Sequence, residues 1–267
     1  MPTKISKIFK RLKQDFKIIK IAKNWREILS AKINGQFVKS IRLRNGVVLN
    51  APGKIDLNFV FHEIWIDEIY LPKGYEINTK DVVFDIGANI GVFSLYASSK
   101  ARDVKVYSFE PFPSNADYFE KNFRESDVNN IYFFRGAVAS KSEKRKLNVS
   151  ESWIKHVLNE KNEENEMYID VECISLDEAF CKIEKCDLLK IDCEGSEYEI
   201  LYSAKPETIN KINKIVGEFH NRDSTDMTGK ALRTFLEKNG LQISNYYNFD
   251  KESGFFAAKR KNHNLTK

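Results

Sequence analysis

Residues 81–99 read DVVFDIGANIGVFSLYASS and contain the most informative pattern in the chain. It begins with the apolar run Val82-Val83-Phe84, which is typical of a strand. A turn with two glycines follows, and the residues from about Val92 to Ser99 predict a helix. A strand, a glycine turn and a helix in this order predict the first unit of an α/β fold.

Strand-like and helical patterns alternate through the rest of the chain. Further strands are expected at 104–109, 131–134, 187–191, 212–219, 242–248 and 254–259, and further helices at 113–123, 197–203 and 229–239. This alternation predicts an α/β fold in which a mostly parallel sheet has helices on both faces. The last two strands leave no room for a crossover helix, so we expect an antiparallel strand at the C-terminal edge of the sheet.

Residues 1–60 predict a small cap that precedes a main domain at 61–267. Apolar residues at helical spacing, with lysines between them, predict one helix over 4–30. Within an alternating run at 37–50, Asn45-Gly46 is a strong signal for a β-hairpin. The cap is therefore expected to consist of a basic helix and a hairpin.

Basic charge is concentrated in this cap. Residues 1–46 hold 13 Lys and Arg against two acids, whereas the remainder holds 30 against 36. The basic helix could lie on a membrane surface. It could also pack on its own domain or on a second subunit and leave its lysines in solvent, which is the more common situation. Peripheral membrane contact and a homo-oligomer therefore both remain open.

The composition is that of a globular protein, with 42% hydrophobic and 30% charged residues among 267. The four cysteines show neither CxxC spacing nor a zinc-ligand spacing to histidine, which indicates reduced thiols and argues against zinc. The chain starts without the apolar core of a signal peptide, and no apolar run approaches the roughly 18 residues that span a bilayer. We therefore expect a cytoplasmic protein that is soluble or membrane-peripheral.

Acidic residues lie at the ends of four of the expected strands or directly after them. They are Asp85, Glu110, Asp192 with Glu194, and Glu218 with the neighbouring His220. Ligands of open parallel sheets bind beyond the carboxyl ends of the strands. Clustered carboxylates repel one another unless something offsets their charge. The pattern therefore predicts a cationic or polyhydroxyl ligand at this edge.

The glycine turn excludes two common nucleotide sites and suits S-adenosylmethionine. A dinucleotide motif, GxGxxG, would need glycine where Asn89 and Val92 stand, and no phosphate-binding GxxxxGK[ST] motif is present. S-adenosylmethionine has no phosphates, and its carboxylate suits a helix N-terminus. We expect Asp85 near its ammonium group and Glu110 at its ribose hydroxyls.

The segments DVVFDIGANIGVFSLYAS, YSFEPFPSN, CISLDEAF, DLLKIDCEGSEYEIL and VGEFH closely resemble FkbM-type methyltransferases. The resemblance covers roughly residues 60–260, and KIDCEGSE at 190–197 is its most specific part. These are class I enzymes that methylate hydroxyls, often of sugars in antibiotics, surface polysaccharides or glycolipids. The resemblance implies cofactor binding by Asp85, Gly87, Asn89, Gly91 and Glu110. It also implies that Gly136-Ala137-Val138 lies by the adenine, and Asp192 and Glu194 near the transferred methyl group.

Methyl transfer to a hydroxyl requires alignment of the acceptor and removal of its proton. The candidates for the base are His220, Asp192 and Glu194, although His220 could equally orient an acid. Asp192, Glu218 and His220 could hold a divalent metal, but we favour an acid network without one. Lys190 is expected either as a buried partner of these acids or on the solvent face.

Other functions fit the sequence less well. The sequence argues against a nucleic-acid acceptor, because the main domain is net acidic and lacks the Asn/Asp-Pro-Pro-aromatic motif of base methylation. A non-catalytic interaction module would not need an intact turn and Glu110. An NAD-linked oxidoreductase would need the missing glycines. The preferred prediction is an S-adenosylmethionine-dependent O-methyltransferase acting on a sugar hydroxyl, with another acceptor, such as a nucleic acid, peptide or lipid, as the alternative.

Overall fold

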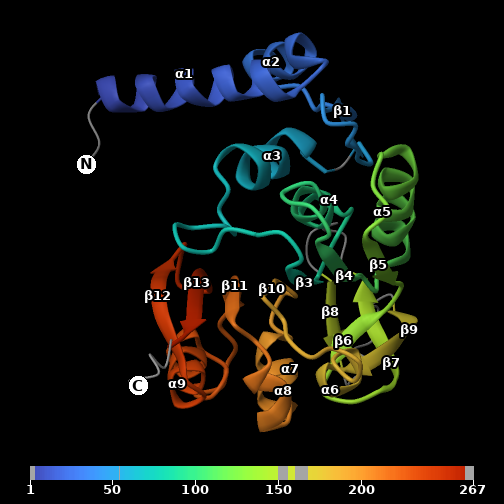
Figure 1. Ribbon diagram of the computed structural model, residues 1–267, viewed down its shortest axis with the longest axis vertical. Coiled ribbons are helices and arrows are strands. Elements are labelled where there is room, and N and C mark those ends of the chain that lie inside the picture. The colour runs from blue at the N-terminus through green and yellow to red at the C-terminus, as the bar shows by residue number, and fades with distance from the viewer. Residues whose placement is uncertain (1–3, 54, 150–155, 160–167, 262–267) are drawn as a thin grey trace.

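The computed structural model describes residues 4–53, 55–149, 156–159 and 168–261. At its centre is a seven-stranded sheet with the order β12-β13-β11-β10-β3-β4-β5 (Figure 1). The five strands from β11 to β5 in this order are parallel to one another. The mostly parallel α/β fold expected from the sequence is therefore confirmed.

The strands of this sheet lie close to the expected ranges. They are β3 (Val82–Ile86), β4 (Lys105–Phe109), β5 (Ile131–Phe134), β10 (Leu188–Ile191), β11 (Lys214–His220), β12 (Leu241–Asn248) and β13 (Ser253–Arg260). The strand β3 continues past the predicted run at 82–84 through Asp85 to Ile86, and β11 ends at His220, one residue beyond the predicted range 212–219. Asp85 and His220 were therefore expected beyond strand ends but belong to the strands themselves.

Helices cover both faces of the sheet, as expected. On one face, α4 (Val92–Ser98) and α5 (Pro113–Glu125) pack in a hydrophobic cluster with alternate strand residues such as Val83 and Val106. On the other face, a second cluster includes Phe84 and Leu189. Its helices are α6 (Leu176–Ala179), α7 (Glu197–Ser203), α8 (Pro206–Asn210) and α9 (Gly229–Lys238).

The C-terminal edge of the sheet differs in one detail from the prediction. The last two strands form the expected antiparallel hairpin, but the C-terminal strand β13 lies between β11 and β12. The edge strand is therefore β12. The helix α9 connects β11 to β12 over the position that β13 occupies, so the hairpin turns back into the sheet.

A second, four-stranded sheet follows β5 and was not predicted. Its order is β6-β9-β7-β8, and the strands are β6 (Ala137–Ala139), β7 (Glu143–Val149), β8 (His156–Asn159) and β9 (Tyr168–Ser175). A small cluster around Ala137, Leu147 and Val171 holds it together. Val171 and Cys173 alternate with the acids Asp170 and Glu172, and this period-two pattern is the sequence signal that could have identified β9.

The N-terminal cap contains two helices rather than one. The prediction of a single helix over 4–30 is wrong, because α1 (Lys4–Ile21) and α2 (Trp25–Asn34) are separated at residues 22–24. The separating residues pair with the expected hairpin, formed by β1 (Ser40–Arg42) and β2 (Val48–Asn50). The Asn24 side chain donates to the Ser40 carbonyl and accepts from the Arg42 amide, which fixes the break.

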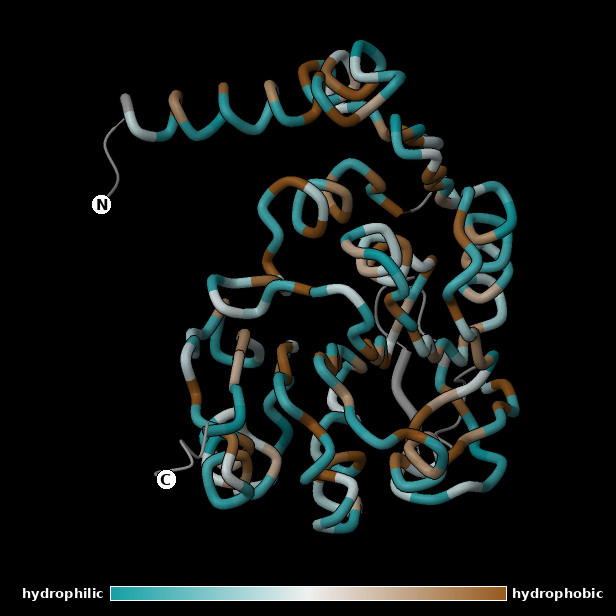
Figure 2. Tube along the Cα trace, viewed as in Figure 1, coloured by the Kyte–Doolittle hydropathy of each residue, from teal (hydrophilic) through white to brown (hydrophobic). Residues whose placement is uncertain are grey.

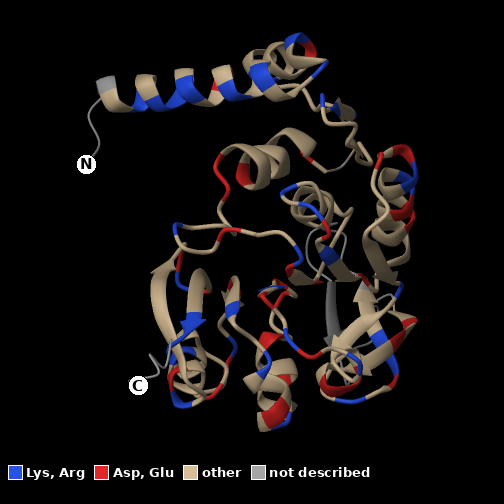
Figure 3. Ribbon diagram, viewed as in Figure 1, with Lys and Arg blue, Asp and Glu red and all other residues tan. Residues whose placement is uncertain are grey.

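Two short helical turns, α3 (Leu57–Phe61) and the π-helical η1 (His62–Ile66), connect the cap to the main sheet. Buried cap residues such as Ile18 and Ile41 share one hydrophobic cluster with strand residues. From its junction with α2, the helix α1 extends toward the N-terminus past the main body of the molecule (Figure 1). Hydrophobic residues recur along the outer edge of α1 (Figure 2). Basic residues recur along its length (Figure 3). No helix in the described part of the chain is long and apolar enough to span a membrane.

Candidate active site

The glycine turn is pressed against the end of β10. Gly87 has a φ of 78°, and a Cβ there would lie 1.8 Å from the Asp192 carbonyl oxygen. The amides of Gly87 and Ala88 both donate to the Phe109 carbonyl, at 3.1 and 2.9 Å. The turn is thus fixed between β4 and β10 by backbone contacts, which explains why only glycine fits at position 87.

Glu110 directly follows β4 and is held beside this turn. Its two carboxylate oxygens accept from the amides of Asn89, at 2.8 Å, and Phe112, at 2.9 Å. Burial raises the pKa of Glu110 to about 7, although both backbone hydrogen bonds favour the charged form. Asn89 itself has a φ of 51°, which turns its amide toward Glu110. The predicted ribose ligand therefore lies next to the predicted cofactor turn.

Asp85 is fully buried below the turn rather than at its surface. It accepts a 2.5 Å hydrogen bond from Ser94 and forms an ion pair with Lys190 at 3.1 Å. Lys190 also donates to the Gly87 carbonyl at 2.7 Å. Burial opposes the charge of Lys190, but Asp85 and Asp192 outweigh this effect and raise its pKa. Lys190 is thus the buried partner of the acids, one of the two expected alternatives.

The opposite side of the site is built from side chains. Tyr70, from the segment after η1, donates to Asp192 at 3.0 Å and lies 3.4 Å from Glu218. Burial and the charge of Asp192 raise the pKa of Glu218 to about 8. Burial likewise raises the pKa of Tyr70, and the neighbouring carboxylates add to this effect. Asp192 and Glu218 therefore form a pair bridged by one phenol.

His220 lies behind this pair and is held by two acids. Its Nδ1 is 3.0 Å from the fully buried Glu197, and its Nε2 is 3.5 Å from Glu194. Burial alone lowers the pKa of His220, but the hydrogen bond to Glu197 and the nearby negative charges raise it to about 9. Glu197 is the first residue of α7, and its role as a partner of His220 was not predicted from the sequence.

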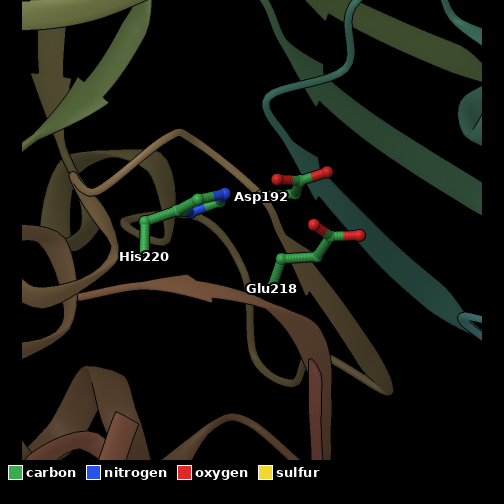
Figure 4. A group of neighbouring side chains, drawn as sticks. All are labelled: Asp192, Glu218 and His220. Carbon is green, nitrogen blue, oxygen red and sulfur yellow. The ribbon is translucent and has the colours of Figure 1, made fainter. Parts of the chain in front are cut away.

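Asp192, Glu218 and His220 form a group that could hold a metal ion. One potential ligand atom from each lies within 4.8 Å of the others. Figure 4 shows the two carboxylates side by side, with the imidazole approaching Asp192. Oxygen ligands with one imidazole suit hard or borderline divalent cations. Side-chain atoms of these three residues already have protein partners in Tyr70, Glu194 and Glu197.

Both halves of the site open onto a cavity of about 550 Å³. Its walls include most of the residues predicted for the site, namely Gly87, Asn89, Glu110, Ala137, Asp192, Glu194 and Glu218. Three other predicted site residues that the structure describes, Asp85, Gly91 and His220, do not line this cavity. Gly91, at the start of α4, has a φ of 84° and lies against Phe119 of α5. These three residues support the walls from behind.

Two lining residues were not expected from the sequence. Tyr70 bridges the acids, and Glu63 of η1 faces the same cavity. Burial, followed by the charges of Asp192 and Asp67, raises the pKa of Glu63 to about 7. Both residues come from the connection between cap and sheet. Nothing in their local sequence indicated that the chain would fold back over the strand ends.

This sheet order, with a glycine turn after β3 and an acid after β4, defines a class I methyltransferase. The chain belongs to the methyltransferase FkbM domain family, whose model matches residues 85–243. The family resemblance stated from the sequence is thereby confirmed. The matched region contains both halves of the cavity except the lining residues between 55 and 70 and those between 249 and 253.

Curated relatives agree with this assignment. The chain is 29% identical to the 31-O-demethyl-FK506 methyltransferase FkbM of Streptomyces tacrolimicus over 217 residues, which are 70% of this chain and 83% of the relative. It is 26% identical to methyltransferase sdnD of Sordaria araneosa, over 73% of this chain and 85% of the relative. It is 25% identical to the AMB antimetabolite synthetase AmbE of Pseudomonas aeruginosa, with 71% of this chain aligned, but spans only 11% of that protein's length.

Proposed function

We propose that the chain is an S-adenosylmethionine-dependent O-methyltransferase whose acceptor is a hydroxyl, most simply that of a sugar. The observation that supports binding of this cofactor is the position of Glu110 at the cavity wall, beside the glycine turn. Its carboxylate is held by two backbone amides and retains lone pairs for two ribose hydroxyls. Ala137 and Val138 supply an apolar wall on the same side, which suits an adenine ring.

The acceptor side favours a hydroxyl because carboxylates face it. Asp192 and Glu218 line the cavity together with Glu63, so the space beyond the turn offers several hydrogen-bond acceptors. A sugar presents several hydroxyl donors to such a wall. The name of the Streptomyces relative specifies an O-demethyl compound as the substrate of that protein, which supports oxygen as the methylated atom here.

In the proposed reaction, the cofactor's sulfonium supplies the methyl group and the chain positions the acceptor oxygen in line with it. Asp192 and Glu218 receive the proton that leaves the acceptor hydroxyl as the carbon–oxygen bond forms. Tyr70 keeps the two carboxylates together through its bridging hydroxyl. Since His220 is held behind the wall by Glu197 and Glu194, we assign it a positioning role.

The reaction is proposed to proceed without a resident metal. The hydrogen bond to Glu197 and the nearby acids raise the pKa of His220 to about 9, so at neutral pH both ring nitrogens carry protons and neither offers a lone pair to an ion. Dialysis against EDTA should therefore leave the rate of methyl transfer unchanged, as compared with a sample re-supplied with Mg²⁺. Loss of activity that Mg²⁺ or Mn²⁺ restores would instead assign Asp192, Glu218 and His220 as ligands.

The first test is calorimetric titration with S-adenosylhomocysteine. The unmodified protein should bind it, and Glu110→Ala should weaken binding at least about tenfold because two hydroxyl hydrogen bonds to a charged group are lost. Glu184→Ala, an exposed acid outside the cavity, is the matched control and should bind normally. Absence of binding by the unmodified protein would support a non-catalytic module instead.

The acceptor is tested by transfer of a labelled methyl group to a panel of glycosides, lipid-linked sugars, peptides and RNA. A methyl ether on a sugar, identified by mass spectrometry, is the expected product. Methylation of RNA or of a peptide alone would contradict the sugar assignment while leaving the cofactor assignment intact.

A further inference from the structure

The helix α1 carries an apolar stripe on the side that faces away from the body. Its members are the large side chains Ile8, Phe9, Leu12, Phe16 and Ile19, which are between 37% and 68% exposed. At 100° per residue they fall within an arc of about 100° on the helix surface. An exposed run of this size is costly in water and marks a surface that binds something.

The opposite side of α1 is the one that packs on the protein. Ile18 is fully buried, Lys17 donates to the Ile66 carbonyl at 2.9 Å, and Gln14 donates to Asp67 at 2.7 Å. These contacts fix the rotation of the helix about its axis. The stripe is therefore presented outward by the fold and is not the inner face of a displaced helix (Figure 2).

Cations border the stripe on both sides. The helix holds seven Lys and Arg and one acid. On a helical wheel Arg11 lies beyond one edge of the stripe, whereas Lys13 and Lys20 lie beyond the other. Figure 3 shows basic residues recurring along the length of α1. An apolar face bordered by lysines is the arrangement of helices that lie in the interface of a bilayer.

We propose that α1 docks this protein on an anionic lipid surface, with Phe9, Leu12 and Phe16 inserted between the headgroups. Charge decides between this partner and a second copy of the chain. Two copies meeting through their stripes would bring two strongly basic helices together, which repel each other. Anionic headgroups provide the opposite charge, and the boundary with the acyl chains provides an apolar layer at the right depth.

Docking would orient the active site relative to the membrane. Lys17 and Gln14 tie α1 to the end of η1 and the residue after it, and η1 contributes Glu63 and Ile64 to the wall of the main cavity. The part of the cavity wall that η1 forms is thus attached directly to the docking helix. The proposal is independent of the acceptor's chemistry and of methyl transfer itself.

Vesicle flotation with the full chain tests the proposal. Vesicles of phosphatidylcholine mixed with phosphatidylglycerol should bind the protein, vesicles of phosphatidylcholine alone should bind it much less, and added salt should weaken binding. Phe9→Gln/Phe16→Gln should reduce binding about a hundredfold, because two aromatic side chains no longer leave water. Lys13→Gln/Lys20→Gln should reduce it about fivefold per charge.

Matched controls remove the same groups elsewhere. Tyr132→Gln/Met227→Gln removes two exposed apolar side chains far from α1, and Lys230→Gln/Lys238→Gln removes two exposed lysines of α9. Both should bind vesicles as the unmodified protein does. Thermal denaturation and S-adenosylhomocysteine titration establish that each variant is folded.

Three results would overturn the proposal. One is equal binding to neutral and anionic vesicles, and another is an equal loss of binding in the controls. The third is a dimer in light scattering that Phe9→Gln/Phe16→Gln converts to a monomer while vesicle binding is absent. That last result would assign the stripe to a subunit interface.

Discussion

The two halves of the cavity are built in different ways. On the side of β3 and β4, the turn and Glu110 are held by backbone amides and carbonyls. On the side of β10 and β11, Asp192 and Glu218 are held by other side chains, chiefly Tyr70. Where backbone groups form the wall, an added side-chain atom overlaps the main chain, as at Gly87. Where side chains form the wall, one residue can replace another without a change of the fold. This division suits an invariant cofactor beside a variable acceptor.

Gly87→Ala should give the largest effect, because it attacks the backbone-built half. The new Cβ would overlap the Asp192 carbonyl, and the positive φ adds strain. We expect a loss of about 5 kcal/mol or more in the free energy of unfolding, measured by urea denaturation. Gly53→Ala is the control, since a Cβ there meets no atom within 4 Å. Equal stability of the two variants would contradict the assigned packing of the turn.

Lys190→Met breaks the link between the halves. It leaves the fully buried Asp85 without its ion-pair partner, which should cost about 4 kcal/mol in the free energy of unfolding. In the double variant Asp85→Asn/Lys190→Met the unpaired charge is removed as well, and stability should partly return. If the loss in free energy of unfolding in the double variant equals the sum of the losses in Asp85→Asn and Lys190→Met, the two side chains do not stabilise each other.

Glu218→Gln attacks the side-chain-built half and should spare the fold. We expect methyl transfer to slow about a hundredfold while the affinity for S-adenosylhomocysteine stays unchanged, because Glu218 lies on the acceptor side. Glu252→Gln, on the exposed turn before β13, is the control. A Glu218→Gln variant that loses cofactor affinity in parallel with activity would show that the two halves are not separable.

The pH dependence of cofactor affinity gives the smallest effect. Burial raises the pKa of Glu110 from 4.5 to about 7, and ribose hydroxyls donate best to its ionised form. The dissociation constant for S-adenosylhomocysteine should therefore rise as the pH falls below about 7, by up to about tenfold per pH unit. Glu110→Gln should bind more weakly and without this dependence.

The same pKa shift has an opposite consequence for the unliganded protein. Since the folded state holds the proton of Glu110 more tightly than the unfolded chain does, this group's contribution to stability decreases as the pH rises from 4.5 to about 7. Denaturation midpoints of the unmodified protein and of Glu110→Gln should diverge in that interval. Parallel midpoints would mean that Glu110 titrates normally.

Local sequence patterns were sufficient to predict the main sheet, the helices on its faces, the turn at 85–91 and the position of Glu110 after a strand. These features depend on local patterns: apolar periodicity, glycine where the backbone needs a positive φ, and an acid directly after a strand. A local pattern can be read from neighbouring residues alone. For the same reason the family resemblance, which follows these segments, was confirmed.

Which polar side chains face the cavity depends on contacts that no local sequence pattern contains. Asp85 and His220 stand on the same expected strand edge as Asp192, yet both lie behind the wall, because β3 and β11 extend through these residues. Tyr70 and Glu63 reach the site from far away in the chain, since the connection after the cap folds over the strand ends. The break between α1 and α2 likewise depends on pairing with the hairpin. Contacts between distant segments leave no periodic signal in the sequence, so they become visible only once the chain has folded.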